Sequence, residues 1–262
     1  QSGQTNSTGE KNVFLGYNSG MSNTEGNSNL FLGTNAGEKN TQGNSNVFLG
    51  FNSGQNSKTG HSNVFIGAQS GQNNDNGFDN VFIGTMVGYS NTGGKYNVFM
   101  GNQSGANFTT GNYNTFLGYQ AGLAHETTKG TGSNNVALGY RSGANLTIGE
   151  NNVFIGTEAG LSTTGNSDPL HKGENTFIGY WAGKDNSTGF QNIAIGYYAG
   201  KGLTTNNRNT IVGNNAGEAL SSGITNAFYG TYAGRETTSG QGNTLLGYDC
   251  GYQVKTGSFN TF

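Results

Sequence analysis

The side chains best suited to chemistry are few and scattered in this chain. Its three histidines, His61, His125 and His171, follow no common spacing. Its 14 acidic residues form no regular series of aspartates such as calcium-binding repeats require. Catalysis needs titratable groups that converge on one place. We therefore expect no catalytic residue, no metal site and no cofactor, and we predict that the chain is not an enzyme.

A short sequence repeat fixes where every side chain can lie. In each repeat an asparagine, three mostly apolar residues and a glycine follow one another, and a second glycine comes four residues after the first. The first glycines are Gly16, Gly33, Gly50, Gly67, Gly84, Gly101, Gly118, Gly139, Gly156, Gly179, Gly196, Gly213, Gly230 and Gly247. They follow a 17-residue period that only two longer steps interrupt, from Gly118 to Gly139 and from Gly156 to Gly179. The paired glycines lack a strand-to-helix context, which excludes a phosphate loop.

Composition narrows the fold and the partners. With 48 glycines and 31% hydrophobic residues in 262, the chain cannot fill a conventional core, whereas stacked identical units could bury a thin continuous one. A formal net charge of −2 with 10% charged residues excludes a nucleic-acid partner. No apolar run reaches the length of a membrane span.

The repeat predicts an all-β fold, a parallel β-solenoid with one coil per repeat and about 14 coils. Triplets such as Val47 to Leu49 combine β-branched and aromatic residues over a strand-sized length, and glycine and asparagine on either side favour corners. We expect residues 1–262 to form a single array, and a segment of a longer one, because a further repeat begins at Asn260. Insertions at 123–134 and 161–174 could carry a functional site, although simple loop growth explains them at least as well.

Strand alternation separates the three positions of each triplet. We assign the third position, the most uniformly apolar, to the coil interior, so the middle position should face outward. An exposed row of phenylalanines would need a second chain to cover it. We therefore predict self-association, with a homotrimer favoured over a monomer. The candidate interchain core is Phe14, Phe31, Phe48, Phe65, Phe82, Phe99, Phe116, Phe154, Phe177 and Phe228. A bulge at the following glycine could instead turn these rings inward.

The asparagine before each triplet predicts a structural ladder. Identical amides stacked at the coil repeat can hydrogen-bond to the neighbouring coil and satisfy backbone groups at the corner. This hydrogen bonding explains why the asparagine recurs in every repeat, and no ligand is needed to explain it. The predicted ladder is Asn12, Asn29, Asn46, Asn63, Asn80, Asn97, Asn114, Asn135, Asn152, Asn175, Asn192, Asn209, Asn226 and Asn243.

Aromatic residues after the first glycine supply the one candidate binding surface. Tyr180, Trp181, Tyr197 and Tyr198 cluster in two successive repeats. Such rings can stack on a sugar or anchor a protein on a host surface. They can equally stabilise neighbouring coils by stacking on one another, and we weigh that structural role more heavily.

Two repeats, Asn135-Val136-Ala137-Leu138-Gly139 and Asn192-Ile193-Ala194-Ile195-Gly196, carry a resemblance to known families. They resemble the head repeats of YadA-like trimeric autotransporter adhesins. Gly118-Tyr119-Gln120-Ala121-Gly122 is similar to the Gly-Tyr-x-Ala-Gly repeat arrays of phage fibres and bacterial surface proteins. The resemblance implies a trimeric β-roll, extracellular or on the cell surface, that serves as a structural and adhesive fibre or adhesin head.

Two other functions compete with that interpretation. A carbohydrate-binding fibre segment, as in some phages, would use the surface aromatic residues. A binder of ice or another crystal surface would need a regular threonine array, and the Thr-Thr pairs that begin at Thr109, Thr127, Thr163, Thr204 and Thr237 are irregularly placed.

Overall fold

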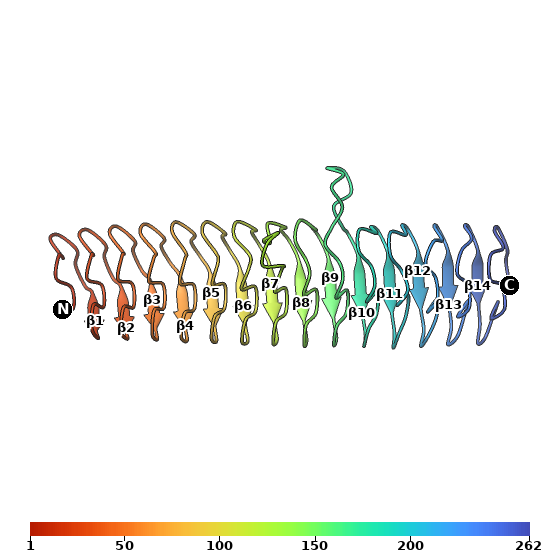
Figure 1. The fold of residues 1–262 in the computed structure, drawn as a ribbon, viewed down its shortest axis with the longest axis horizontal. Helices are drawn as coiled ribbons and strands as arrows, with labels where there is room; N and C mark the ends of the chain where they lie inside the picture. Colours follow the sequence, from red (N-terminus) through yellow and green to blue (C-terminus); the bar gives the residue numbers. More distant parts are fainter. The chain divides into compact units, whose positions relative to one another are not determined.

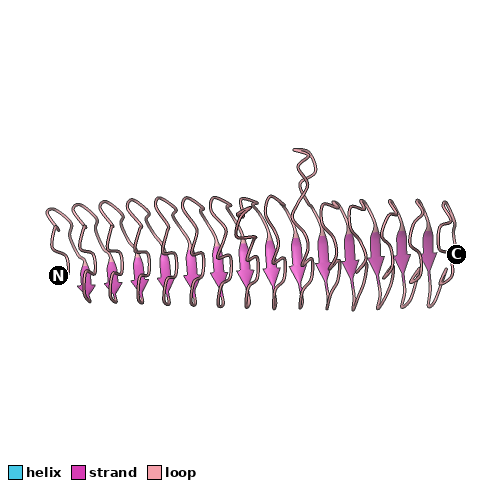
Figure 2. Ribbon diagram, viewed as in Figure 1, coloured by secondary structure: helices cyan, strands magenta, loops and turns pink.

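The computed structural model describes all residues, 1–262, and is all-β without any helix (Figures 1 and 2). It has no helix of the length and hydropathy needed to cross a lipid bilayer. The chain divides into two compact units, residues 1–131 and 132–262. The first contains β1 (Val13–Leu15), β2 (Leu30–Leu32), β3 (Val47–Leu49), β4 (Val64–Ile66), β5 (Val81–Ile83), β6 (Val98–Met100) and β7 (Thr115–Leu117). The second contains β8 (Val136–Leu138), β9 (Val153–Ile155), β10 (Thr176–Ile178), β11 (Ile193–Ile195), β12 (Thr210–Val212), β13 (Ala227–Tyr229) and β14 (Thr244–Leu246).

Within each unit the strands pair in parallel with their neighbours along the chain. In the first unit, for example, Val47 pairs with Val64 and Leu49 with Ile66. The same register joins β8 to β9 and each later pair in the second unit. Within each unit, every triplet therefore lies on the equivalent triplet of the next coil (Figure 1). The prediction of an all-β solenoid with one coil per sequence repeat is confirmed.

Glycine is required at two corners of each coil. Gly50 has a φ of 135°, and a Cβ there would stand 2.6 Å from the carbonyl oxygen of Gly67 in the next coil. Gly54 has a φ of 55°, and its Cβ would stand 2.5 Å from the ring of Phe48. Both conformations strain residues with a side chain, and both sites lack the space for one. The corners thus bring coils to backbone contact and leave room for the phenylalanine.

The middle residue of each strand points into the coil, contrary to the expectation from alternation. Phe48 and Phe65 are fully buried within the single chain, and their ring centroids lie 4.9 Å apart with planes 5° from parallel. The third residue, Leu49 for example, is half-buried on the outer face. The assignment of the third position to the interior was wrong, because the glycine corners leave space for a ring inside so narrow a coil.

The same geometry corrects the predicted interchain core. Phe31, Phe48, Phe65, Phe82, Phe99, Phe116, Phe154, Phe177 and Phe228 are completely buried by their own chain. Phe14, in the first coil, is half-buried and stacks on Phe31 at 5.1 Å. These rings form the core of the coils that contain them, and the completely buried ones are not available to a second chain.

A second interior position lies seven residues after the first glycine, and its size is matched to the strand. Beside a phenylalanine it is mostly a buried polar residue, such as Asn40, Ser57 or Thr163. Where the middle strand residue is smaller, as at Ala137, Ala194 and Ile211, the position is Leu146, Leu203 and Leu220. The two positions share one interior volume, which must be filled to native density.

The asparagine column forms a continuous hydrogen-bonded ladder within each unit. The backbone N–H of Asn63 donates to Asn46 Oδ1 at 3.0 Å. Asn63 Nδ2 donates to the carbonyl oxygen of Gly77 at 2.8 Å, and the pattern repeats at Asn80 and Asn97. These amides are buried, so each satisfies backbone groups that would otherwise be unpaired in the interior. The structure gives the column a structural role.

Candidate functional site

The three histidines lie apart and each has a local partner. The ring of His61 stacks on Phe78 with centroids 4.7 Å apart. His171 stacks on Phe190 at 4.6 Å, and its Nδ1 lies 3.8 Å from Glu174 Oε2. His125 Nδ1 lies 2.9 Å from the hydroxyl of Thr127. No three His, Cys, Asp or Glu side chains come close enough together to hold a metal ion.

The two insertions differ in how they are held. In the first, Gly130 pairs with Phe108 in a parallel bridge, and Lys129 Nζ donates to Asn107 Oδ1 at 3.3 Å, so the segment packs against its own unit. The second forms the loop that protrudes between β9 and β10 (Figure 1). Its base is closed by an ion pair of 2.8 Å between Lys172 and Glu150, and Leu170 near its tip is 76% exposed. The titratable groups that the second insertion brings together are thus two pairs, His171 with Glu174 and Lys172 with Glu150.

The predicted aromatic residues do come together in the second unit. Tyr180 stacks on Trp181 and on Tyr197, with centroids 5.0 and 5.4 Å apart. Tyr198 meets Tyr197 edge-on at 4.3 Å and Trp181 at 5.1 Å. Tyr180 and Tyr197 remain 39% and 48% exposed. The four residues, hereafter the aromatic cluster, therefore stack largely on one another while keeping an exposed rim.

Basic side chains cover part of the cluster. Lys184 Nζ lies 3.3 Å from the ring centroid of Trp181 and 2.8 Å from Glu158 Oε2. Lys201 Nζ lies 5.5 Å from the Trp181 centroid and 5.4 Å from that of Tyr198. Both cations are at distances where the negative face of an aromatic ring attracts them. No ion pair involves Lys201.

The hydroxyl of Tyr198 is perturbed by its neighbours. A hydrogen bond with Tyr197 raises the pKa of Tyr198 to about 12, with partial burial and the charges of nearby groups adding to the effect. Glu218 is among those groups. Tyr198 therefore stays protonated at neutral pH and remains a hydrogen-bond donor or acceptor on the rim of the cluster.

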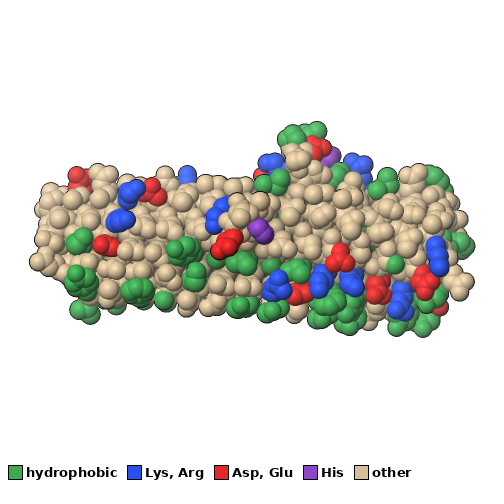
Figure 3. Space-filling view, in the orientation of Figure 1, with side chains coloured by type: hydrophobic (Ala, Val, Ile, Leu, Met, Phe, Trp, Pro, Cys, Tyr) green, Lys and Arg blue, Asp and Glu red, His purple; other side chains and the backbone are tan.

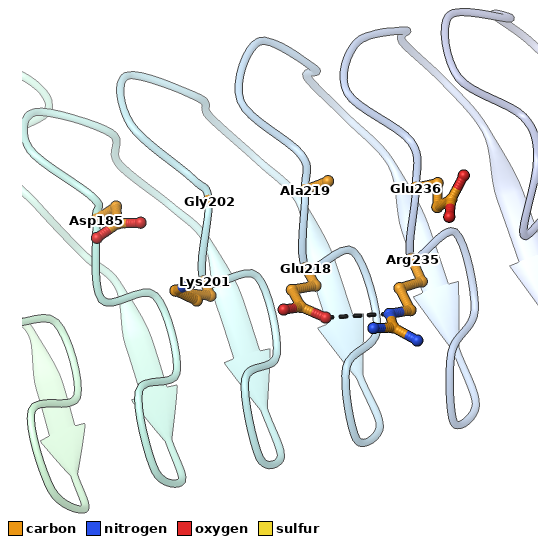
Figure 4. A pocket seen from close by; sticks show the side chains of 7 residues that line it. All are labelled: Asp185, Lys201, Gly202, Glu218, Ala219, Arg235 and Glu236. Atoms are coloured by element: carbon orange, nitrogen blue, oxygen red, sulfur yellow. Dashed lines mark hydrogen bonds and ion pairs between the residues drawn. The ribbon is translucent and has the colours of Figure 1, made fainter.

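A shallow groove adjoins the cluster through Lys201. It has a volume of about 370 Å³ and is lined by Asp185, Lys201, Gly202, Glu218, Ala219, Arg235 and Glu236 (Figure 4). One row of this groove reads Asp185, Gly202, Ala219, Glu236, one residue from each of four coils, and Lys201, Glu218 and Arg235 form the row beside it. Arg235 Nε donates to Glu218 Oε2 at 3.2 Å.

Sequence reasoning missed the groove, although its signal was present. Asp185, Gly202, Ala219 and Glu236 are each one repeat apart, as are Lys201, Glu218 and Arg235. The residue type in these two columns changes from coil to coil, so they do not stand out from the sequence as the columns of identical glycine or asparagine do. Only the hollow itself required the structure: Gly202, which has no side chain, and Ala219, which has one methyl group, lie between the longer side chains of Asp185 and Glu236.

In each unit, the side of the parallel strands that faces away from the coil interior is mostly apolar, and no other part of the chain covers it. The first and third strand positions of the first unit are Val, Leu, Ile or Met in every case except Thr115, and all are half-buried or exposed. Parallel sheets are usually covered on both faces. Exposed hydrophobic side chains, those of the corner aromatics included, are visible in the N-terminal half and in the C-terminal half alike (Figure 3). We call the first and third strand positions together the outer sheet face.

The threonine hydroxyls are committed to the coil itself. Thr109 Oγ1 donates to the carbonyl oxygen of Gly130 at 3.2 Å, and Thr204 Oγ1 to that of Ser221 at 3.0 Å. Thr237 Oγ1 donates to the carbonyl oxygen of Val254 at 2.7 Å. These bonds tie one coil to the next, and nothing in the placement of these threonines favours a crystal-surface ligand.

The architecture is established by the repeats and the structure, and no similarity to a known protein supports it further. Comparison with protein-family models, curated proteins and solved structures yields no match. What is shown is a repetitive parallel β-solenoid in which each coil corresponds to one sequence repeat.

Proposed function

We propose that this chain is a non-catalytic structural and adhesive element that self-associates through its outer sheet face. The observation that carries the proposal is that face, a row of side chains that is almost wholly aliphatic in the first unit and mostly apolar in the second, left uncovered in both. In inner coils, Ile193, Leu117 and Met100 are 39%, 37% and 36% exposed. Soluble monomers rarely expose contiguous apolar patches beyond a few hundred Å².

Cyclic self-association would cover the face economically. If equivalent faces of several chains meet around a common axis, every chain buries the same residues. A homotrimer is the favoured stoichiometry, because the YadA-like head repeats that the sequence resembles are trimeric. In this proposal the aliphatic positions replace the phenylalanines as the interchain contact, and the stacked rings make each chain rigid.

The proposed location is extracellular or on the cell surface. The support is the resemblance of the repeats to adhesin heads and fibre arrays. The architecture is also suited to a fibre, because each further copy of one short repeat lengthens the solenoid by one coil. A host surface or matrix component is the proposed target of the adhesive role.

Light scattering on the purified chain tests the self-association. We expect a mass of about three times 27.3 kDa for the natural sequence. Leu49→Lys combined with Ile83→Lys places two charges on the outer sheet face and should yield monomers with an unchanged circular dichroism spectrum. The control Gln42→Lys adds a charge at an exposed residue of the coil before that of Leu49, outside the strands, and should leave the mass unchanged. A monomeric natural chain would refute the proposal.

A further inference from the structure

We propose that the groove beside the aromatic cluster binds a neutral oligosaccharide laid along the direction in which the coils stack. None of the residues that line the groove belongs to a strand, so this site is separate from the outer sheet face. The inference does not depend on self-association, because every lining residue comes from one chain.

The size of the groove suits a short extended ligand. Asp185 and Glu236 stand at its ends, three coil steps apart, which corresponds to about 14 Å. Gly202 and Ala219 form the floor between them (Figure 4). The volume of about 370 Å³ lies within the range of small-ligand sites. A linear chain of a few sugar rings fits between the two carboxylates.

The charges select for a neutral ligand. Three carboxylates, of Asp185, Glu218 and Glu236, lie with the two cations of Lys201 and Arg235, so the groove carries a formal charge of −1. A polyanion would meet a carboxylate at each end, and a polycation would meet Lys201 between the ends and Arg235 beside Glu236. A sugar hydroxyl both donates and accepts hydrogen bonds, so it can pair with groups of either sign.

The aromatic cluster supplies the second requirement for a sugar. The C–H face of a pyranose ring packs on aromatic rings, and Tyr198 and Trp181 border the groove at Lys201. The other groove with lysines, in the first unit, is lined by Lys39, Asn56, Lys58, Asn73, Asp75 and Thr92 and has no aromatic residue. This difference distinguishes the two grooves and provides an internal control.

Trp181 is the only tryptophan of the chain, so its fluorescence reports directly on the rim of the groove. The experiment titrates the full chain with cellohexaose, chitohexaose and mannohexaose as neutral probes, and with oligogalacturonate as the acidic one. We expect at least one neutral probe to shift the Trp181 emission in a saturable manner and to release heat in calorimetry, and oligogalacturonate to do neither.

Substitutions then locate the site. Ala219→Arg fills the floor and should weaken neutral-sugar binding about tenfold or more, whereas Ser22→Arg, at the same position of a coil in the first unit, should not. Asp185→Asn keeps the shape and should also weaken binding about tenfold by removing a charged acceptor. Binding of oligogalacturonate alone, binding of no probe, or full affinity in both Ala219→Arg and Asp185→Asn would overturn the inference.

Discussion

Leu203 occupies the interior space that Ala194 leaves empty in the same coil. Leu203 Cδ1 and Ala194 Cβ lie 2.9 and 3.2 Å from the point where a Cβ on Gly200 would stand. In a coil with phenylalanine, the equivalent glycine faces the ring itself, as Gly54 faces Phe48. One strand residue and one corner residue therefore fill a single volume together.

This pairing predicts strong coupling between the two residues. Ala194→Phe should overpack the coil and lower the free energy of unfolding by about 1–3 kcal/mol. Leu203→Asn should lower it by about 2–5 kcal/mol through the lost packing. The double variant restores the phenylalanine and asparagine pairing of other coils, so we expect it to be more stable than the sum of the single effects by at least about 1 kcal/mol.

Urea denaturation of the four chains measures the coupling. Leu146→Asn replaces Leu203→Asn in the control cycle, because Leu146 lies in the coil of Ala137 and does not share volume with Ala194. We expect the control cycle to be additive. Additivity in both cycles would show that the two interior positions are independent.

The second interior position, seven residues after the first glycine, is asparagine at Asn23, Asn40, Asn74 and Asn91, and Ser57 interrupts this column. Asn40 Nδ2 donates to Asn23 Oδ1 at 2.7 Å, but Asn40 Oδ1 and Ser57 Oγ have no hydrogen-bond partner. Ser57→Asn lengthens the side chain toward Asn40 and should raise the free energy of unfolding by about 1 kcal/mol. Thermal unfolding followed by circular dichroism measures this change.

Two serine-to-alanine variants calibrate that result. Ser57→Ala removes a hydroxyl that bonds to nothing and should change stability little. Ser53→Ala removes a donor to the carbonyl oxygen of Phe65, at 3.0 Å, and should cost about 1 kcal/mol. If Ser57→Asn destabilised the chain as much as Ser53→Ala, the proposed completion of the column would be wrong.

Glycines at different places in the coil should differ sharply in their tolerance of alanine. Gly50→Ala introduces a Cβ against the Gly67 carbonyl at a φ of 135°, and we expect a cost of at least about 2 kcal/mol. At Gly93 a Cβ would meet only the flexible end of the Asn76 side chain, at 2.9 Å. Gly93→Ala should therefore be neutral or stabilise by about 0.5 kcal/mol, because it restricts the unfolded chain. Equal losses in chemical denaturation would contradict this ranking.

Tyr198 should ionise later than an ordinary tyrosine. Its pKa is raised from 10.0 to about 12, mainly by the hydrogen bond with Tyr197. Because the folded state favours the protonated phenol, this contribution to stability is complete below pH 10 and is lost as the pH rises through about 12. Tyr252 also has a raised pKa, through its hydrogen bond with Glu236, so the titration is made in the Tyr252→Phe background. Phenolate absorbance followed during alkaline titration of that chain should show one late tyrosine.

The variant Tyr197→Phe isolates the cause. Without the partner hydroxyl, the pKa of Tyr198 should fall toward its ordinary value, and the late step should disappear. Tyr113→Phe, in the first unit, removes one phenol from the total and should leave the late step in place. A late step that survives Tyr197→Phe would assign the shift to burial or charge instead.

Much of the fold follows from spacing, and the candidate sites follow from it only in part. The asparagine before each triplet and the glycine after it recur so regularly that parallel coils are the one arrangement that stacks them. The cluster of Tyr180 and Tyr197 could also be predicted, because residues one repeat apart meet on neighbouring coils. The groove floor at Gly202 and Ala219 could not, because its depth depends on the heights of the side chains around it.

The sequence by itself determined the coil, its length and the stacking of like residues, since a fixed period places equivalent residues at one height in successive coils. Only the tertiary structure decided which side of the strand faces inward. Alternation separates Phe48 from Leu49 but does not say which of them is buried, because both are apolar. The positive φ of Gly50 and Gly54 turns the chain so that the ring of Phe48 lies inside and Leu49 outside. Because the phenylalanines lie inside the coil, the contact that we expect between chains is at the outer sheet face.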